Sequence, residues 1–156
     1  MPVTIDDRTA VPSDARIRAL HERLAPSREA LRLVWTHCRI VCDIAEQLLD
    51  HSGVDADAPF CSRHTGVGIS RADVRRQGLP IPAADYTAVT AEEHLVMYAD
   101  KFHSKTTPPS FVSAASYAVA VGRFGADKAD RFAALVERFG EPDLPMLAAR
   151  YRQPIV

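Results

Sequence analysis

Apolar residues recur along this chain at spacings of three and four, which is the spacing of one face of an α-helix. The pattern is clearest in residues 90–105, TAEEHLVMYADKFHSK, where Thr90 and Glu93 have the spacing of a capping box. The apolar stripe of this segment consists of Leu95, Val96, Ala99 and Phe102. At about 100° per residue, Asp100 lies at the edge of that stripe. A carboxylate buried there needs a metal, a lysine or a histidine as its partner.

The same reasoning predicts an all-α fold. The longest predicted helix has an apolar stripe that contains one histidine: Val34, His37, Val41, Ile44 and Leu48. Helices are predicted over residues 14–24, 28–50, 71–77, 90–105, 110–124, 126–139 and 143–151. No run alternates strictly between apolar and polar residues, as a half-buried strand would. We therefore expect a single helical domain over residues 13–156 that follows an irregular tail over residues 1–12.

Composition limits the classes of function. A chain of 156 residues suits one domain with a real core, and its apolar fraction of 47% is ordinary for a globular protein. The net charge of −1 gives no electrostatic footprint for nucleic acid. No apolar run approaches membrane-spanning length, and the first residues lack a signal-peptide pattern. Three cysteines without the spacing of a disulfide scaffold predict a reducing cytoplasm.

Two residues on predicted helices and one loop suggest chemistry. His37 occupies a core position where Leu or Val is typical, so it is either a hydrogen-bonded core histidine or a metal ligand. Asp100 leaves the same two interpretations open. In residues 61–70, CSRHTGVGIS, His64 precedes two glycines and a helix start, where the backbone passes close to a ligand and anions are favoured. A plain helix–loop–helix turn explains this loop equally well.

Three segments occur in an order that is found in a known family: HCRIVCDIAEQLL, which begins at His37, then RHTGVGISRADVRRQGLPIP, then TAEEHLVMYADKFHSK. Over residues 27–105 the chain resembles the HD-domain superfamily of metal-dependent phosphohydrolases, in particular its compact bacterial and archaeal members. The resemblance implies a helical bundle that holds a divalent metal (Mn, Mg, Fe or Zn) and acts on phosphate esters or nucleotides. By position it implies that His37, Asp100 and His64 are metal ligands.

The resemblance also implies that Lys101 and Arg63 stabilise the negative charge of a phosphate. The family's His-Asp doublet is missing, because no His is followed by Asp anywhere in the chain. Catalytic metal sites usually have three protein ligands, so we expect weak metal binding and low or absent activity. Because the missing segment would also have covered core surface, association into a homodimer is expected.

Two alternatives from other classes stay open. A structural zinc site would use Cys38, Cys42, Cys61 and His64, although the first two cysteines are equally typical of small core residues. A non-catalytic ligand-binding or interaction module on an HD scaffold would hold an anion with a group of arginines beside the glycine loop. These arginines are Arg63, Arg71, Arg75 and Arg76. A solvated helix face is the plainer interpretation of that group.

Overall fold

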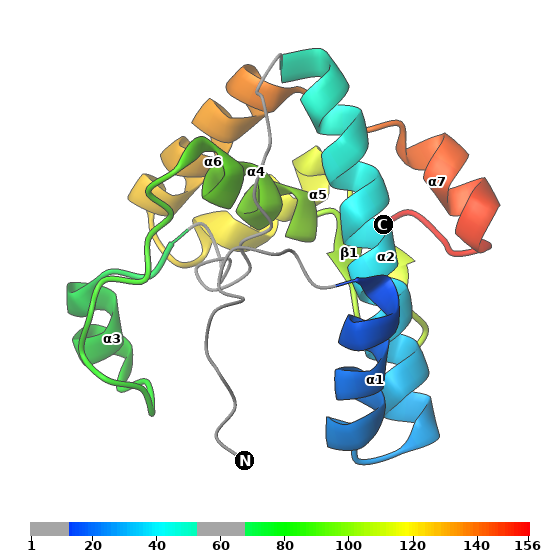
Figure 1. Cartoon of the computed structure of the whole chain (residues 1–156). Helices are drawn as coiled ribbons and strands as arrows, with labels where there is room; N and C mark the ends of the chain where they lie inside the picture. Colours follow the sequence, from blue (N-terminus) through cyan, green and yellow to red (C-terminus); the bar gives the residue numbers. More distant parts are fainter. Residues whose placement is uncertain (1–12, 53–67) are drawn as a thin grey trace.

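The computed structural model describes residues 13–52 and 68–156, and within these ranges the fold is all-α, as the sequence predicts (Figure 1). The described residues form seven helices and one two-stranded antiparallel hairpin. The helices are α1 (Asp14–Leu24), α2 (Arg28–Ser52), α3 (Arg71–Gln77), α4 (Ala91–Asp100), α5 (Ala114–Gly122), α6 (Ala126–Phe139) and α7 (Leu144–Tyr151). The strands are β1 (His103–Ser104) and β2 (Ser110–Phe111). The predicted site residues Arg63 and His64, and also Cys61, lie outside the described ranges.

The described core is built on α2. Ile40, Ile44 and Leu48 recur every four residues on one face of this helix and are fully buried. They share one hydrophobic cluster with five large aromatic side chains: Tyr98, Phe102, Phe111, Phe132 and Phe139. Burial of each such side chain contributes roughly 1.5–3 kcal/mol. Figure 1 shows α4, α5 and α6 gathered on one side of α2, with α7 on the other side.

Local capping explains where several helices begin and end. Both halves of the predicted capping box are present at α4, between Thr90 and Glu93, and a second box joins Ser70 and Asp73 at the start of α3. Gly78 ends α3 with a φ of 59°, a left-handed conformation that glycine adopts without a side-chain penalty. These ends agree with the sequence prediction.

Two helix boundaries were predicted wrongly. Helix α4 ends at Asp100 instead of Lys105, and α5 begins at Ala114 instead of near residue 110. The chain between them folds into the β1–β2 hairpin, which turns through two prolines that cannot donate backbone hydrogen bonds. The hairpin lets Phe102 and Phe111 both reach the core, where each is fully buried. Strands of two residues are too short to show the alternation that would predict them.

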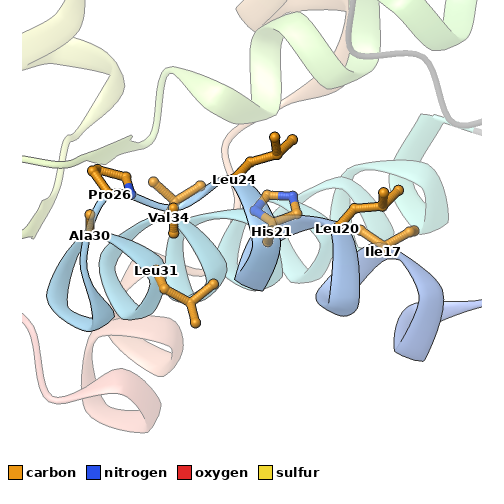
Figure 2. Close-up of a pocket in the computed structure, with 9 residues that line it drawn as sticks. Ile17, Leu20, His21, Leu24, Pro26, Ala30, Leu31 and Val34 are labelled. Atoms are coloured by element: carbon orange, nitrogen blue, oxygen red, sulfur yellow. The ribbon is translucent and has the colours of Figure 1, made fainter.

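Helix α1 and the first part of α2 form an antiparallel hairpin that projects away from the other helices (Figure 1). None of the α1 residues is buried. Apolar side chains along the hairpin, among them Leu20, Leu24 and Val34, line an open groove of about 410 Å³ (Figure 2), which we call the N-terminal groove. The homodimer that the sequence predicts stays a prediction.

Within the described ranges, no helix is both long enough and apolar enough to cross a lipid bilayer. The longest helix, α2, has 25 residues but alternates its apolar stripe with charged positions.

Candidate functional site

His37 and Asp100 meet where α2 packs against α4. The Nε2 atom of His37 lies 3.0 Å from the Oδ1 atom of Asp100, and His37 is only 7% exposed. Lys101 follows Asp100 in the chain, and its ammonium donates to the Oδ2 atom of the same carboxylate at 2.8 Å. The partners of Asp100 are therefore a histidine and a lysine, two of the three kinds that the sequence suggests.

The structure adds three residues that the sequence reasoning did not select. His103 on β1 places its Nδ1 atom 2.8 Å from Nδ1 of His37. On its other side, Nε2 of His103 lies 2.7 Å from Oε1 of Gln153. The ammonium of Lys105 lies 3.1 Å from Nε2 of His37. We call the whole set the His37 cluster: His37, Asp100, Lys101, His103, Lys105 and Gln153.

Signals for these three residues were weak or absent in the sequence. His103 and Lys105 stood in the segment predicted as the last turn of a helix, where their side chains would have taken different directions. The early end of α4 and the strand that follows direct His103 toward α2. Gln153 reaches the cluster only because the end of the chain returns to it, and no local pattern predicts that contact.

Burial and neighbouring charges shift the pKa values of the His37 cluster in opposite directions. Burial opposes ionisation of Asp100, but the contact with His37 and the charge of Lys101 outweigh it and hold the pKa of this carboxyl well below its usual range. Burial also lowers the pKa of Lys101, and the neighbouring Asp100 partly restores it. The pKa of His103 is lowered, chiefly by burial, although the contact with Gln153 acts in the opposite direction. The cluster therefore combines one carboxylate with two lysines.

A small pocket adjoins the cluster. It has a volume of about 320 Å³, and His103 and Gln153 form part of its lining. Arg32 and Thr36 of α2 line it from one side, and Thr106 and Thr107 of the β1–β2 turn line it too. Arginine and hydroxyl side chains are common donors to phosphate groups.

The described residues provide two adjacent ligand types for a metal. An imidazole nitrogen and a carboxylate oxygen face each other between His37 and Asp100. In residues 13–52 and 68–156, no group of three or more His, Cys, Asp or Glu side chains is placed to hold a metal ion. His64, which the family resemblance suggests as a further ligand, stays a prediction because it lies outside these ranges.

The two alternative sites are only partly described. Cys38 is half-buried and Cys42 is exposed on α2, while the other two members of the predicted zinc set are not described. On α3, the three described arginines of the anion-binding hypothesis, Arg71, Arg75 and Arg76, are all exposed. Figure 1 shows α3 well separated from β1, which carries His103. The fold therefore does not bring these arginines to the His37 cluster.

Helix α3 is fixed by a buried ion pair of its own. Lys128 of α6 donates to Asp73 at 2.6 Å and to the carbonyl oxygen of Gly68 at 3.2 Å. Both side chains are almost fully buried, and the bonds from Lys128 and Ser70 hold the pKa of Asp73 well below its usual range. Because every polar atom of the pair has a partner, the pair is explained by its structural role.

Comparisons of the chain with protein-family models, with curated proteins and with solved structures find no significant match. The resemblance to the HD-domain superfamily therefore rests on the segments quoted from the sequence.

Proposed function

We propose that this chain is an HD-type domain that binds a divalent metal and a small phosphorylated molecule or nucleotide at the His37 cluster, with slow or absent hydrolysis. One observation carries the proposal. His37 and Asp100 are 63 residues apart in the chain, yet their Nε2 and Oδ1 atoms lie 3.0 Å apart between α2 and α4. Imidazole and carboxylate are ligand types that divalent metals take in hydrolases, and these two match the first and last ligands of the family pattern.

The charges around the pair support a phosphorylated ligand. Lys101 and Lys105 both approach it, so their two positive charges outweigh the single negative charge of Asp100. The adjoining pocket adds the guanidinium of Arg32 and several threonine hydroxyls. An anionic ligand would therefore find both charge and hydrogen-bond donors beside the proposed metal ligands.

When bound, a divalent metal polarises a phosphoryl oxygen and makes water a better nucleophile. In the proposed site His37 and Asp100 would hold that ion. Lys101 and Lys105 stabilise negative charge on the phosphate. The family resemblance adds His64 and Arg63 as a further ligand and a further cation. With fewer than three strong ligands, affinity for the metal is expected to be modest.

A non-catalytic ligand-binding module is the second candidate. The finding that favours it is the lack of a three-ligand group among the described residues. In that case the two lysines and Arg32 would hold an anion without turning it over. The two functions differ in whether binding of the anion depends on metal.

Binding of Mn²⁺, measured by calorimetry on the purified chain, tests the proposal. We expect His37→Ala and Asp100→Ala each to abolish saturable Mn²⁺ binding, because each removes one of the two matched ligands. His94→Ala and Asp130→Asn are the matched controls, since His94 of α4 and Asp130 of α6 are not members of the His37 cluster. His64→Ala tests the third ligand in the same experiment.

Saturable Mn²⁺ binding that survives in both cluster variants would refute the metal site. If the wild-type chain binds no Mn²⁺ but binds inorganic phosphate or a nucleoside monophosphate, and Lys105→Ala weakens that binding, the non-catalytic module is the correct function. Phosphate release from a nucleotide that rises with added Mn²⁺ would instead exclude the module.

A further inference from the structure

We propose that the N-terminal groove is a docking site for an acidic amphipathic helix of a partner protein. The groove lies along the hairpin of α1 and the first part of α2, and apart from His21 the residues that line it are apolar (Figure 2). Leu24 is 81% exposed and Leu20 is 46% exposed, although both face this groove. A contiguous group of exposed apolar side chains marks an interaction site, whereas isolated ones are normal on a protein surface.

Helix α1 is poorly covered by the rest of the described chain. It has 11 residues, and none of them is buried. On the side toward α2, the ring of His21 lies edge to face against Trp35, and the guanidinium of Arg18 lies over the Trp35 ring. A helix this short is only marginally stable unless its apolar face is packed. A third helix in the groove would supply that packing and form a three-helix layer with α1 and α2.

Two arginines border the groove along α1. At about 100° per residue, Arg16 and Arg23 lie within about 20° of each other, next to Leu20 and opposite the side of α1 that contacts Trp35. Seven residues separate them, which is about 10.5 Å along the helix axis. Both arginines are exposed, and neither makes an ion pair within the described part of the chain. Their charges are therefore available to a partner in the groove.

These positions define the chemistry of the partner helix. Its apolar side chains, at spacings of three and four, would fill the groove beside Leu20, Leu24 and Val34. Aspartates or glutamates seven residues apart on one edge of the same helix would match the spacing of Arg16 and Arg23. Such complementary charges select the partner and fix its register in the groove.

A second copy of this chain is a poorer match for the groove. Residues 14–32 contain five arginines and three acidic residues, although the whole chain has a net charge of −1. A two-fold dimer through the groove would bring this positive surface against itself. Like charges across an interface are unfavourable, so an acidic partner is favoured over a second copy.

Binding of two designed peptides to the full chain tests the proposal. The Glu peptide has about 18 residues, enough to form a helix, with leucines on one face and two glutamates seven residues apart at the edge of that face. The Lys peptide is identical except that lysines replace these two glutamates. By calorimetry we expect saturable binding of the Glu peptide and binding of the Lys peptide that is weaker by about tenfold or more.

The emission of Trp35 reports where the Glu peptide binds. This residue is the single tryptophan of the chain, and its ring contacts His21, which lines the groove. Occupation of the groove should therefore change the emission in step with the binding measured by calorimetry. Saturable binding with unchanged emission would place the peptide elsewhere and overturn the proposal.

Charge reversal at the edge of the groove tests the role of the arginines. Arg16→Glu/Arg23→Glu should weaken binding of the Glu peptide by about tenfold or more and make the Lys peptide the tighter ligand. Arg131→Glu/Arg138→Glu is the matched control, because these arginines are also exposed and seven residues apart, on α6. We expect this control to prefer the Glu peptide, as the wild type does.

Removal of an apolar side chain tests the floor of the groove. Leu24→Ser should weaken binding of the Glu peptide about tenfold, because a leucine that the bound helix would cover is lost. Val119→Ser is the matched control, since Val119 is an exposed apolar residue of α5 outside the groove. Circular dichroism shows whether each variant keeps the fold.

Several results would overturn the proposal. The first is no saturable binding of the Glu peptide to the wild type, and the second is equal affinity for the two peptides, which needs no variant. A third is loss of binding in the α6 control but not in Arg16→Glu/Arg23→Glu. A wild-type dimer in sedimentation equilibrium that Leu24→Ser converts to a monomer would instead assign the groove to a second copy.

Discussion

Two parts of α2 that are only one helical turn apart differ in how far their side chains are buried. Val34 is an apolar residue that stays 36% exposed in the N-terminal groove, whereas His37 is a polar residue that is buried at 7% exposure. The sequence pattern places both on the same stripe. The difference is what packs against them, because α1 covers the first stretch only partly while α4 and β1 enclose the second. Burial along a helix is therefore decided by its neighbours, and periodicity identifies only the face.

The two parts of α2 also differ in how firmly their side chains are held in position. In the groove, apolar side chains such as Leu24 contact little, so no geometry is imposed on them. In the cluster each buried polar group must find a partner, which fixes the angles of two rings and the place of a carboxylate. Trp35 of α2 contacts α1 through two side chains: it lies edge to face against His21, and the guanidinium of Arg18 lies over its ring.

The largest expected effect comes from the enclosed part of α2. Ile44→Ala removes a fully buried side chain from the core, and we expect it to lower the free energy of unfolding by roughly 2–5 kcal/mol. Val34→Ala, on the same helix and also at a β-branched residue, should cost much less because its side chain is part-exposed. Urea unfolding of both variants measures the difference. Similar losses for the two variants would contradict the contrast between the two stretches.

A smaller change in the free energy of unfolding is expected when the pH is lowered. The pKa of Asp100 is lowered in the folded chain, because its partners outweigh the effect of burial. Such a carboxylate stabilises the fold above its unfolded pKa of about 4, and the contribution, on the order of 2 kcal/mol, is lost as the pH falls through the lower folded value. Asp100→Asn should therefore make the free energy of unfolding less dependent on pH below about 4.

Urea unfolding at several pH values checks this expectation, with Asp130→Asn as the exposed control. Asp73 also has a lowered pKa and is present in both variants, so it adds the same acid sensitivity to each. An Asp100→Asn curve parallel to that of the wild type over this range would show that the carboxylate is not held ionised by its neighbours.

The smallest effect is expected in the groove. Leu24 is 81% exposed, and Leu24→Ser should change the free energy of unfolding by less than about 0.5 kcal/mol. Thermal melting at low protein concentration measures this. A loss of several kcal/mol would mean that Leu24 is covered in the folded protein. The N-terminal groove would then not be open to solvent.

Much of the fold followed from local signals. Capping residues and the three-and-four spacing predicted the helices, because these signals act within a few residues. The β1–β2 hairpin was missed because long-range burial of Phe102 and Phe111, together with the returning chain end, stabilises it. A segment with helical spacing thus ended early when tertiary packing favoured another conformation.

The candidate site was predictable only in part, for the same reason. His37 and Asp100 were selected because a polar residue on an apolar stripe requires a partner, and the structure brings them together. His103 was misplaced by the helix prediction, and Gln153 joins the cluster from 50 residues away. The arginines of α3 looked equally promising in the sequence, but their positions along the chain carried no information about distance from His37.

The chain end that returns to β2 also offers a way to observe the site through its backbone. The amide hydrogens of Phe111 and Ser113 are bonded to the carbonyl oxygens of Pro154 and Val156. Their exchange with deuterium therefore depends on whether this end is docked. The same docking places Gln153 beside His103, so the exchange rates of two backbone amides report the assembly of a histidine cluster that they do not touch.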